Sequence, residues 1–301
     1  MEFRKENDSI GEREIEKDAY YGVQSFRASE NFKITGLHAH KAMIRSVAEL
    51  KKASALVNAE VGMLDQKIAD AIVQACDEII AGDEALINAF IVDPVQGGAG
   101  TSFNMNANEV IAGRGNEIAG KPLLHPNDDV NMSQSSNDTF PSAMHIAAVL
   151  SIEEKVLPAA GKLVKALEEL EEANRDVIKS GRTHLQDDTP IRFSQEISGW
   201  RASVARDREM LKRTLEPLRE LALGGTAVGT GLNAPEGFGE KAAEELTDLT
   251  GTRFVSAGNK FHALTAKDQL VFAHGALKAL AADCMKIAND VRWLAGGPRC
   301  G

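Results

Sequence analysis

The feature that most restricts the fold is a long helical repeat between about residues 259 and 295. Apolar or small residues recur there every seven positions in two series: Leu270, Leu277, Cys284 and Val291, and Ala273, Leu280, Ile287 and Leu294. A two-position repeat of this kind predicts a helix that packs along another helix at an angle of about +20°. At a rise of about 1.5 Å per residue, this helix would be about 50 Å long.

Two further long helices are predicted in the second half of the sequence. One follows Pro141 and should kink at Pro158, because proline removes a backbone hydrogen bond inside a helix. The other follows the segment SGRTHLQDDTP and carries apolar residues at helical spacing: Phe193, Ile197, Trp200, Val204, Leu211, Leu215 and Leu218. Helices of this length carry more apolar surface than three of them can bury. We therefore expect this body to pack against copies of the same chain.

The first half of the sequence is more mixed. Residues 1–40 are rich in turn-forming residues, and two helical patterns follow within residues 41–81, separated by Gly62. The apolar stripe of the first of these helices includes Lys51 next to Leu50.

Strand signals are few, although the run RFVSA near Arg253 is possible hairpin material. The predicted fold is mainly α. We expect a mixed N-terminal domain over residues 1–140 and a long-helix bundle domain over residues 141–301.

Composition excludes several classes of protein. The chain is 43% hydrophobic and 26% charged, which is ordinary for a globular protein. Its densely charged start is unlike a secretory signal, and no run is apolar enough to span a membrane. The net charge of −10 argues against a nucleic-acid partner, and an anionic ligand would need a local site. Three widely spaced cysteines fit neither a disulfide framework nor a zinc site, so we expect a cytoplasmic protein: Cys76, Cys284 and Cys300.

One polar stretch, HPNDDVNMSQSSNDTFP at residues 125–141, is unusually rich in small hydrogen-bonding side chains. Such a segment can be a solvated loop, and Ser135, Ser136, Asn137 or Asp138 can simply cap the helix that follows. It can also supply neutral donors to a carboxylate at the start of that helix.

A second polar segment contains the glycine loop at residues 97–100, followed by the hydroxyls of Thr101 and Ser102. Glycines there permit positive φ and close approach of the backbone to a ligand. The segment is neither a Walker A motif nor a G-x-G-x-x-G motif, and a simple turn before a helix is an equally good interpretation.

Taken together, five segments make the whole chain resemble the aspartase/fumarase superfamily: GGAGTSFNMNANEV, HPNDDVNMSQSSNDTFP, SGRTHLQDDTP, LGGTAVGTGLN and NKFHAL. The resemblance implies a mostly helical homotetramer with a central helical core shared by four subunits. It also implies an enzyme that releases fumarate by β-elimination, with active sites composed of residues from different subunits.

The resemblance further implies roles for matching residues. Residues that would bind the substrate are Thr101, Ser102, Ser135, Ser136 and Asn137. Thr183 and His184 would be catalytic and would reach the site from another subunit. A secondary anion site would be formed by His125, Asn127 and Asp128. The substrate would be a small dicarboxylate, and we expect no metal, organic cofactor, nucleic acid or membrane partner.

The motifs divide between two reactions of this superfamily. DAYYGVQSFRASENFKITG and DPVQGGAGTS resemble aspartate ammonia-lyases, whereas HPNDDVN, QSSNDTFP and the final third resemble class II fumarases. Near the predicted site the fumarase-like features are more numerous. We therefore favour reversible hydration of fumarate to malate, with deamination of aspartate as the alternative.

Superfamily members continue past the position of Gly301, with a loop that carries the base serine. We expect a polypeptide of these residues alone to lack significant lyase activity. A fragment of an enzyme and a non-catalytic scaffold are the further alternatives.

Overall fold

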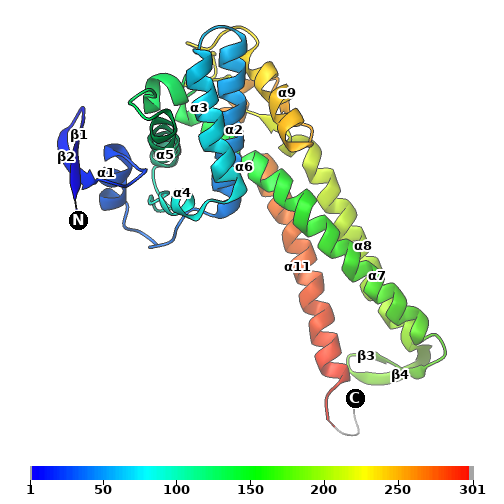
Figure 1. Ribbon diagram of the computed structural model, residues 1–301. Helices are drawn as coiled ribbons and strands as arrows, with labels where there is room; N and C mark the ends of the chain where they lie inside the picture. Colours follow the sequence, from blue (N-terminus) through cyan, green and yellow to red (C-terminus); the bar gives the residue numbers. More distant parts are fainter. Residues whose placement is uncertain (1, 298–301) are drawn as a thin grey trace. The chain divides into compact units, whose positions relative to one another are not determined.

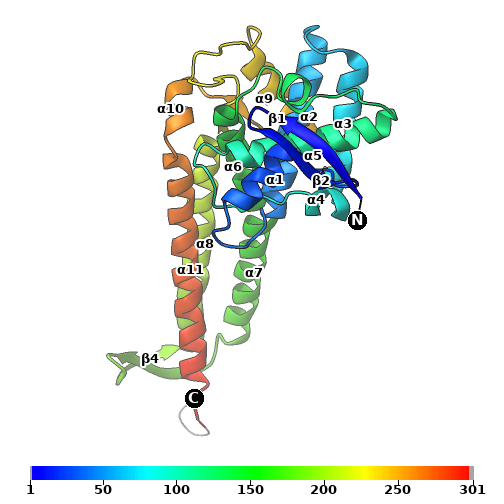
Figure 2. The ribbon, with the colours of Figure 1, turned by 90° about the vertical axis from the view of Figure 1, so that its left-hand side faces the viewer.

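The computed structural model describes residues 2–297 and is mainly helical, which confirms the predicted fold class (Figures 1 and 2). Its contacts divide the chain into two compact units. The first comprises residues 1–148 and 219–266, and the second comprises residues 149–218 and 267–301. The predicted division at residue 140 placed 219–266 in the second part, so the two divisions differ for that segment.

The first unit is built on helices α2, α3 and α5, which enclose an apolar core (Figure 1). Its helices are α1 (Val23–Asn31), α2 (Lys41–Glu60), α3 (Gln66–Ala81), α4 (Glu84–Asn88), α5 (Thr101–Ala119), α6 (Ser136–Ser151), α9 (Phe238–Thr250) and α10 (Lys260–Thr265), with the π-helical turn η1 (Pro126–Val130). Its strands are β1 (Phe3–Asp8), β2 (Gly11–Glu16), β5 (Glu220–Leu221) and β6 (Val255–Ser256). Because α9 packs on α2, the segment 219–266 belongs to this unit.

Local capping explains where several of these helices begin. Asp65 accepts the backbone N–H of Lys67 at the start of α3, and Gly82 ends that helix with a φ of 93°. His40 accepts the N–H of Ala42 through Nδ1 at 3.1 Å. His40 is therefore the N-cap of α2.

The N-terminal arm contains an antiparallel hairpin, β1–β2, that the sequence pattern did not predict. Arg4 fastens the arm, since its Nη1 donates to the carbonyls of Glu16, Lys17 and Ala19 at 2.7–2.9 Å. The buried carboxylate of Glu109 accepts backbone N–H groups at the start of α1. The arm is thus held by specific polar bonds as well as by its aromatic side chains.

The second unit consists of the long helices α7 (Leu157–Ala173), α8 (Phe193–Leu218) and α11 (Asp268–Leu294), with the hairpin β3 (Ile178–Thr183) and β4 (Gln186–Arg192). Figure 1 shows α7 and α8 side by side, with this hairpin at the end where they are joined. One series of the seven-residue repeat packs into the core of this unit: Leu280, Ile287 and Leu294 against Ala160, Leu167, Ile197, Trp200 and Val204.

Four details differ from the sequence predictions. The helix predicted over 259–295 is two helices, because Ala266 adopts an extended backbone between α10 and α11. The helix predicted to begin near Pro141 begins at Ser136. The run near Arg253 forms a parallel pair with β5 instead of a hairpin. The segment SGRTHLQDDTP, for which no strand was predicted, lies within the β3–β4 hairpin.

The irregularity expected near Pro158 is present as a π-helical turn, η2 (Ile152–Val156), directly before α7. Such a turn absorbs the hydrogen bond that proline cannot make. Among residues 2–297, no helix has the length and apolar character that crossing a membrane requires.

Candidate active site

The start of α6 is capped by the side chains of Ser135 and Asp138. Ser135 Oγ accepts the N–H of Asn137 at 3.2 Å, and Asp138 Oδ1 accepts the N–H of Ser135 at 2.9 Å. The pattern is similar to a capping box with aspartate in place of glutamate, but the serine accepts the N–H two residues ahead instead of three. The capping interpretation is thus correct for Ser135 and Asp138, while Ser136 and Asn137 occupy the first helical turn.

Asp138 also ties this helix to the glycine-rich segment at residues 224–239. Its Oδ2 accepts the N–H groups of Gly224 at 3.1 Å and Thr226 at 2.8 Å. Asn137 Nδ2 donates to Ala227 O at 2.8 Å. Burial raises the pKa of the Asp138 carboxyl, although the three backbone N–H groups favour its charged form. The sequence hinted at this role only through the Ser-x-x-Asp spacing.

The start of α5 lies against the start of α6. Gly100 precedes α5 with a φ of 75°, and a Cβ atom there would lie 2.0 Å from Cγ of Phe140. Asn104, one turn into α5, donates through Nδ2 to Ser136 Oγ at 2.9 Å. The structure therefore brings Thr101, the exposed first residue of α5, to the same region as Ser136.

Two helix N-termini that meet in this way favour an anion. Each contributes the positive end of a helix dipole. Hydroxyl and amide side chains add neutral donors at the same place. A chain with a net charge of −10 thereby contains a local site suited to carboxylates.

Lys51 lies beneath this region and was not identified as a site residue from the sequence. It is fully buried in α2, and its Nζ donates to Asn131 Oδ1 at 2.9 Å and Gln134 Oε1 at 2.8 Å. Burial lowers the pKa of Lys51 to about 7, and the nearby Asp138 carboxylate opposes this shift. The sequence feature that could have identified Lys51 is the presence of a lysine on an apolar helical stripe.

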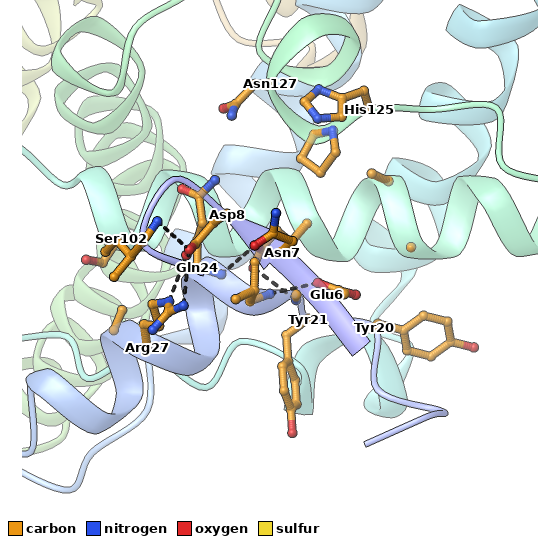
Figure 3. A pocket seen from close by; sticks show the side chains of 18 of the residues that line it. Glu6, Asn7, Asp8, Tyr20, Tyr21, Gln24, Arg27, Ser102, His125 and Asn127 are labelled. Carbon is orange, nitrogen blue, oxygen red and sulfur yellow. Dashed lines mark hydrogen bonds and ion pairs between the residues drawn. The ribbon is translucent and has the colours of Figure 1, made fainter. Parts of the chain in front are cut away.

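The residues predicted to form a secondary anion site lie at a separate pocket of about 970 Å³. Figure 3 shows His125 and Asn127 across this pocket from the ion pair of Asp8 and Arg27. Ser102 also lines the pocket, so it lies with these outer residues.

The third residue predicted for this outer site, Asp128, is exposed and is not among the lining residues. His125 accepts the N–H of Asp128 through Nδ1 at 3.2 Å. This bond orients the imidazole at the start of η1.

Thr183 and His184 belong to the second unit, at the tip of the β3–β4 hairpin. His184 and Leu185 have φ values of 49° and 63° and form the two-residue turn between paired Thr183 and Gln186. This left-handed turn normally favours glycine or asparagine. Both predicted catalytic side chains are exposed, and Thr183 Oγ1 donates to Asp188 Oδ2 at 3.4 Å.

Within the described part of the chain, no cluster of three or more histidine, cysteine or acidic side chains is placed to hold a metal ion. Cys76 and Cys284 are free thiols, and Cys300 lies outside the described residues.

Comparison with known proteins agrees with the motifs. The sequence matches the family described as Lyase over residues 11–301. Class II fumarate hydratases of Helicobacter pylori strain J99 and Campylobacter jejuni are 51% and 53% identical to it, and each comparison covers all of this chain. The chain spans 66% of the length of each of these relatives.

A crystal structure of class II fumarase from Schistosoma mansoni is also similar. It superposes with a TM-score of 0.96 at 36% identity, covering all of this chain and 67% of that one. The fold, the motifs and these similarities together establish that the chain belongs to the lyase family, within the aspartase/fumarase superfamily.

Proposed function

We propose that the protein catalyses the reversible hydration of fumarate to L-malate, as a class II fumarase. The observation that carries this proposal is the meeting of the first turns of α5 and α6, which gathers Thr101 and Ser135–Asn137 at two helix N-termini. The similarity to class II fumarate hydratases over the full length of the chain supports the same reaction.

The chemistry requires stabilisation of negative charge. Removal of a proton next to a carboxylate gives an aci-carboxylate that carries two negative charges on that group. Donors already aimed at its oxygens stabilise this intermediate more than the substrate, and such preorganised donors are usually the largest catalytic contribution. The Ser136 hydroxyl, the Asn137 amide and the N-terminus of α6 are donors of this kind.

The remaining predicted residues have supporting roles in this proposal. His125, Asn127 and Asp128 would form an outer anion site, with Ser102 at the same pocket. Thr183 and His184 would be supplied by another subunit of a homotetramer, and the imidazole would bond the leaving group or a water molecule. We assign the general base to none of the described residues.

The exposed apolar side chains of the long helices support assembly of the second unit with further copies. We therefore propose a homotetramer with composite active sites, a cytoplasmic location and a place in the tricarboxylic acid cycle. No metal or organic cofactor is part of this proposal.

Deamination of L-aspartate is the second candidate, because the N-terminal segment and the Gly97–Gly100 loop resemble aspartate ammonia-lyases. The two reactions are distinguished by giving the purified complete polypeptide L-malate and L-aspartate separately and following fumarate absorbance. We expect fumarate from malate. Fumarate from aspartate alone would overturn the proposal, and none from either would favour a non-catalytic scaffold.

The variant Ser136→Thr is a sharper probe of the same choice, because Ser136 lies in QSSNDTFP, one of the segments that resemble class II fumarases. The added methyl group would enter a partly buried position beside Asn104. We expect it to lower the rate with malate and not to create a rate with aspartate. A gain of aspartate turnover would identify Ser136 as the residue that selects the substrate.

A further inference from the structure

The polar network beneath the first turn of α6 is anchored by Lys51. Its Nζ donates to Asn131 Oδ1 at 2.9 Å and to Gln134 Oε1 at 2.8 Å. The side chain is 0% exposed, so these bonds replace the water that the amine loses on folding. Lys51 is therefore a fixed part of the structure under the site.

A lysine ammonium can only donate hydrogen bonds, and this sets the direction of the bonds beyond it. Asn131 presents its carbonyl oxygen to Lys51, and the same oxygen accepts Asn104 Nδ2 at 3.0 Å. Asn104 Nδ2 also donates to Ser136 Oγ at 2.9 Å. Ser136 thus accepts a bond from the protein interior, which leaves its own O–H to donate elsewhere.

The orientation of Asn104 is set by Asn131. The Oδ1 of Asn104 is buried and has no hydrogen-bond partner among the described residues. If the amide turned around, Oδ1 would face the Asn131 oxygen, and the N–H groups would take the buried position where Oδ1 now has no partner. Asn104 therefore keeps the orientation in which Nδ2 donates to Asn131 Oδ1 and Ser136 Oγ. Asn131 in turn is held by Lys51 and by a longer bond from its Nδ2 to Gln134 O at 3.3 Å.

We propose that Lys51 is a positioning residue that directs the Ser136 hydroxyl toward a substrate carboxylate. It acts through Asn131 and Asn104 and does not touch the substrate. The inference rests on the proposed function, because the carboxylate is the acceptor that the free O–H would meet.

The direction of the bonds survives loss of the ammonium proton. Burial lowers the pKa of Lys51 to about 7, so the charged and neutral forms both occur near neutral pH. The neutral amine keeps two N–H donors, which is the number that Asn131 and Gln134 require. We therefore expect Ser136 to keep its orientation in both forms.

The first test needs no substrate. Thermal midpoints would be measured at one protein concentration for the complete protein, Lys51→Met, Ser136→Ala and the double variant. In the wild type, Ser136→Ala leaves a buried N–H of Asn104 without its acceptor and lowers the midpoint. In the Lys51→Met background Asn104 can reorient, so the midpoint should fall by less than half as much. Equal falls in both backgrounds would overturn the proposal.

The second test uses the same four proteins with fumarate. Lys51→Met should lower kcat/KM about tenfold, as expected for losing one hydrogen bond to a charged group. Most of this loss should appear in kcat, because the aimed hydroxyl stabilises the aci-carboxylate more than the substrate. Ser136→Ala should add little in that background. A folded Lys51→Met variant with the wild-type kcat/KM would contradict the proposal.

Two further variants keep these tests decisive. Lys52→Met is the matched control, because Lys52 forms an ion pair with Asp77 away from the network, and it should leave kcat/KM unchanged. If Lys51→Met fails to fold, Asn104→Leu interrupts the same path and should lower kcat/KM similarly; an unchanged kcat/KM would overturn the proposal. Absence of turnover in the wild type would overturn the proposed function, while the unfolding cycle would still decide the role of Lys51.

Discussion

Gly100 occupies a position at which a side chain meets both a conformational and a steric barrier. Its φ of 75° is in the left-handed region, and a Cβ atom would fall within 2.0 Å of the Phe140 ring. The ring belongs to α6, so relieving the clash would move the two helix starts apart. The position of Thr101 relative to Ser136 thus depends on a residue that has no side chain.

We expect Gly100→Ala to lower the free energy of unfolding by about 2–4 kcal/mol, because left-handed strain and overpacking add. Gly97→Ala is the matched control. No atom lies within 4 Å of its added Cβ, and we expect a change of about 0.5 kcal/mol or less. Denaturant unfolding measures both. Equal stability of the two variants would mean that Phe140 moves aside freely.

Lys51 gives the protein a particular pH dependence of stability. Burial lowers the pKa of Lys51 from 10.5 to about 7, so between these pH values the unfolded chain binds more protons than the folded one. The free energy of unfolding should therefore rise with pH in this range. From pH 7 to 9, the wild type should gain on the order of 2 kcal/mol relative to Lys51→Met in urea unfolding. Lys52→Met should follow the wild type, and parallel curves for all three proteins would refute the expectation.

At the scale of elements, Asp138 joins α6 to the glycine-rich segment. Its carboxylate accepts three backbone N–H groups, from Ser135, Gly224 and Thr226. These bonds hold the loop that also receives the amide of Asn137. The same carboxylate thus caps α6 and binds a loop that is distant in the sequence.

Removal of this carboxylate should destabilise the first unit strongly. We expect Asp138→Ala to lower the free energy of unfolding by about 3 kcal/mol or more, because one buried and two partly buried donors lose their acceptor. Asp65→Ala removes a cap that accepts one exposed N–H and should cost about 1 kcal/mol. Both are measured by denaturant unfolding, and similar losses would show that the loop contacts of Asp138 contribute little.

The sequence predicted a helix well where apolar residues repeat over many turns. It predicted helix ends and strands poorly where contacts with distant residues determine them. The apolar stripe predicted from Phe193 to Leu218 has the same bounds as α8, because apolar spacing alone determines which face of this helix is buried. The start of α6 was misplaced by five residues, since its cap depends on Asp138 meeting a loop almost ninety positions away. The parallel β5–β6 pair likewise joins segments that lie apart in the sequence, since Glu220 pairs with Val255.

The candidate site shows the same limit. Motif resemblance selected Ser136 and Asn137, and the structure places both in the first turn of α6. Motif resemblance could not select Lys51, because a lysine that lies beside Lys52 on a helix is usually exposed to solvent. Only the fold shows that Lys51 points into the interior. Ser102, which the resemblance places with Thr101 among the substrate-binding residues, lines the pocket of His125.

At the scale of the whole molecule, α11 leaves a large apolar surface exposed in a single chain. Val271, Phe272, Met285, Val291 and Trp293 are each 50–68% exposed. The series that packs inward, which ends at Leu294, uses only one side of the helix. Exposed apolar side chains of this number on one helix indicate an interface between proteins.

We expect this surface to bury itself against further copies of the chain, and charged substitutions should prevent it. Val271 and Met285 lie two heptads apart on one side of α11, so the double variant Val271→Glu/Met285→Glu places two carboxylates in the interface. Light scattering during size-exclusion chromatography should show smaller particles than the wild type. Leu37→Glu/Met63→Glu alters similarly exposed residues of the first unit and should keep the wild-type mass. An unchanged mass for the α11 variant would place the subunit interface elsewhere.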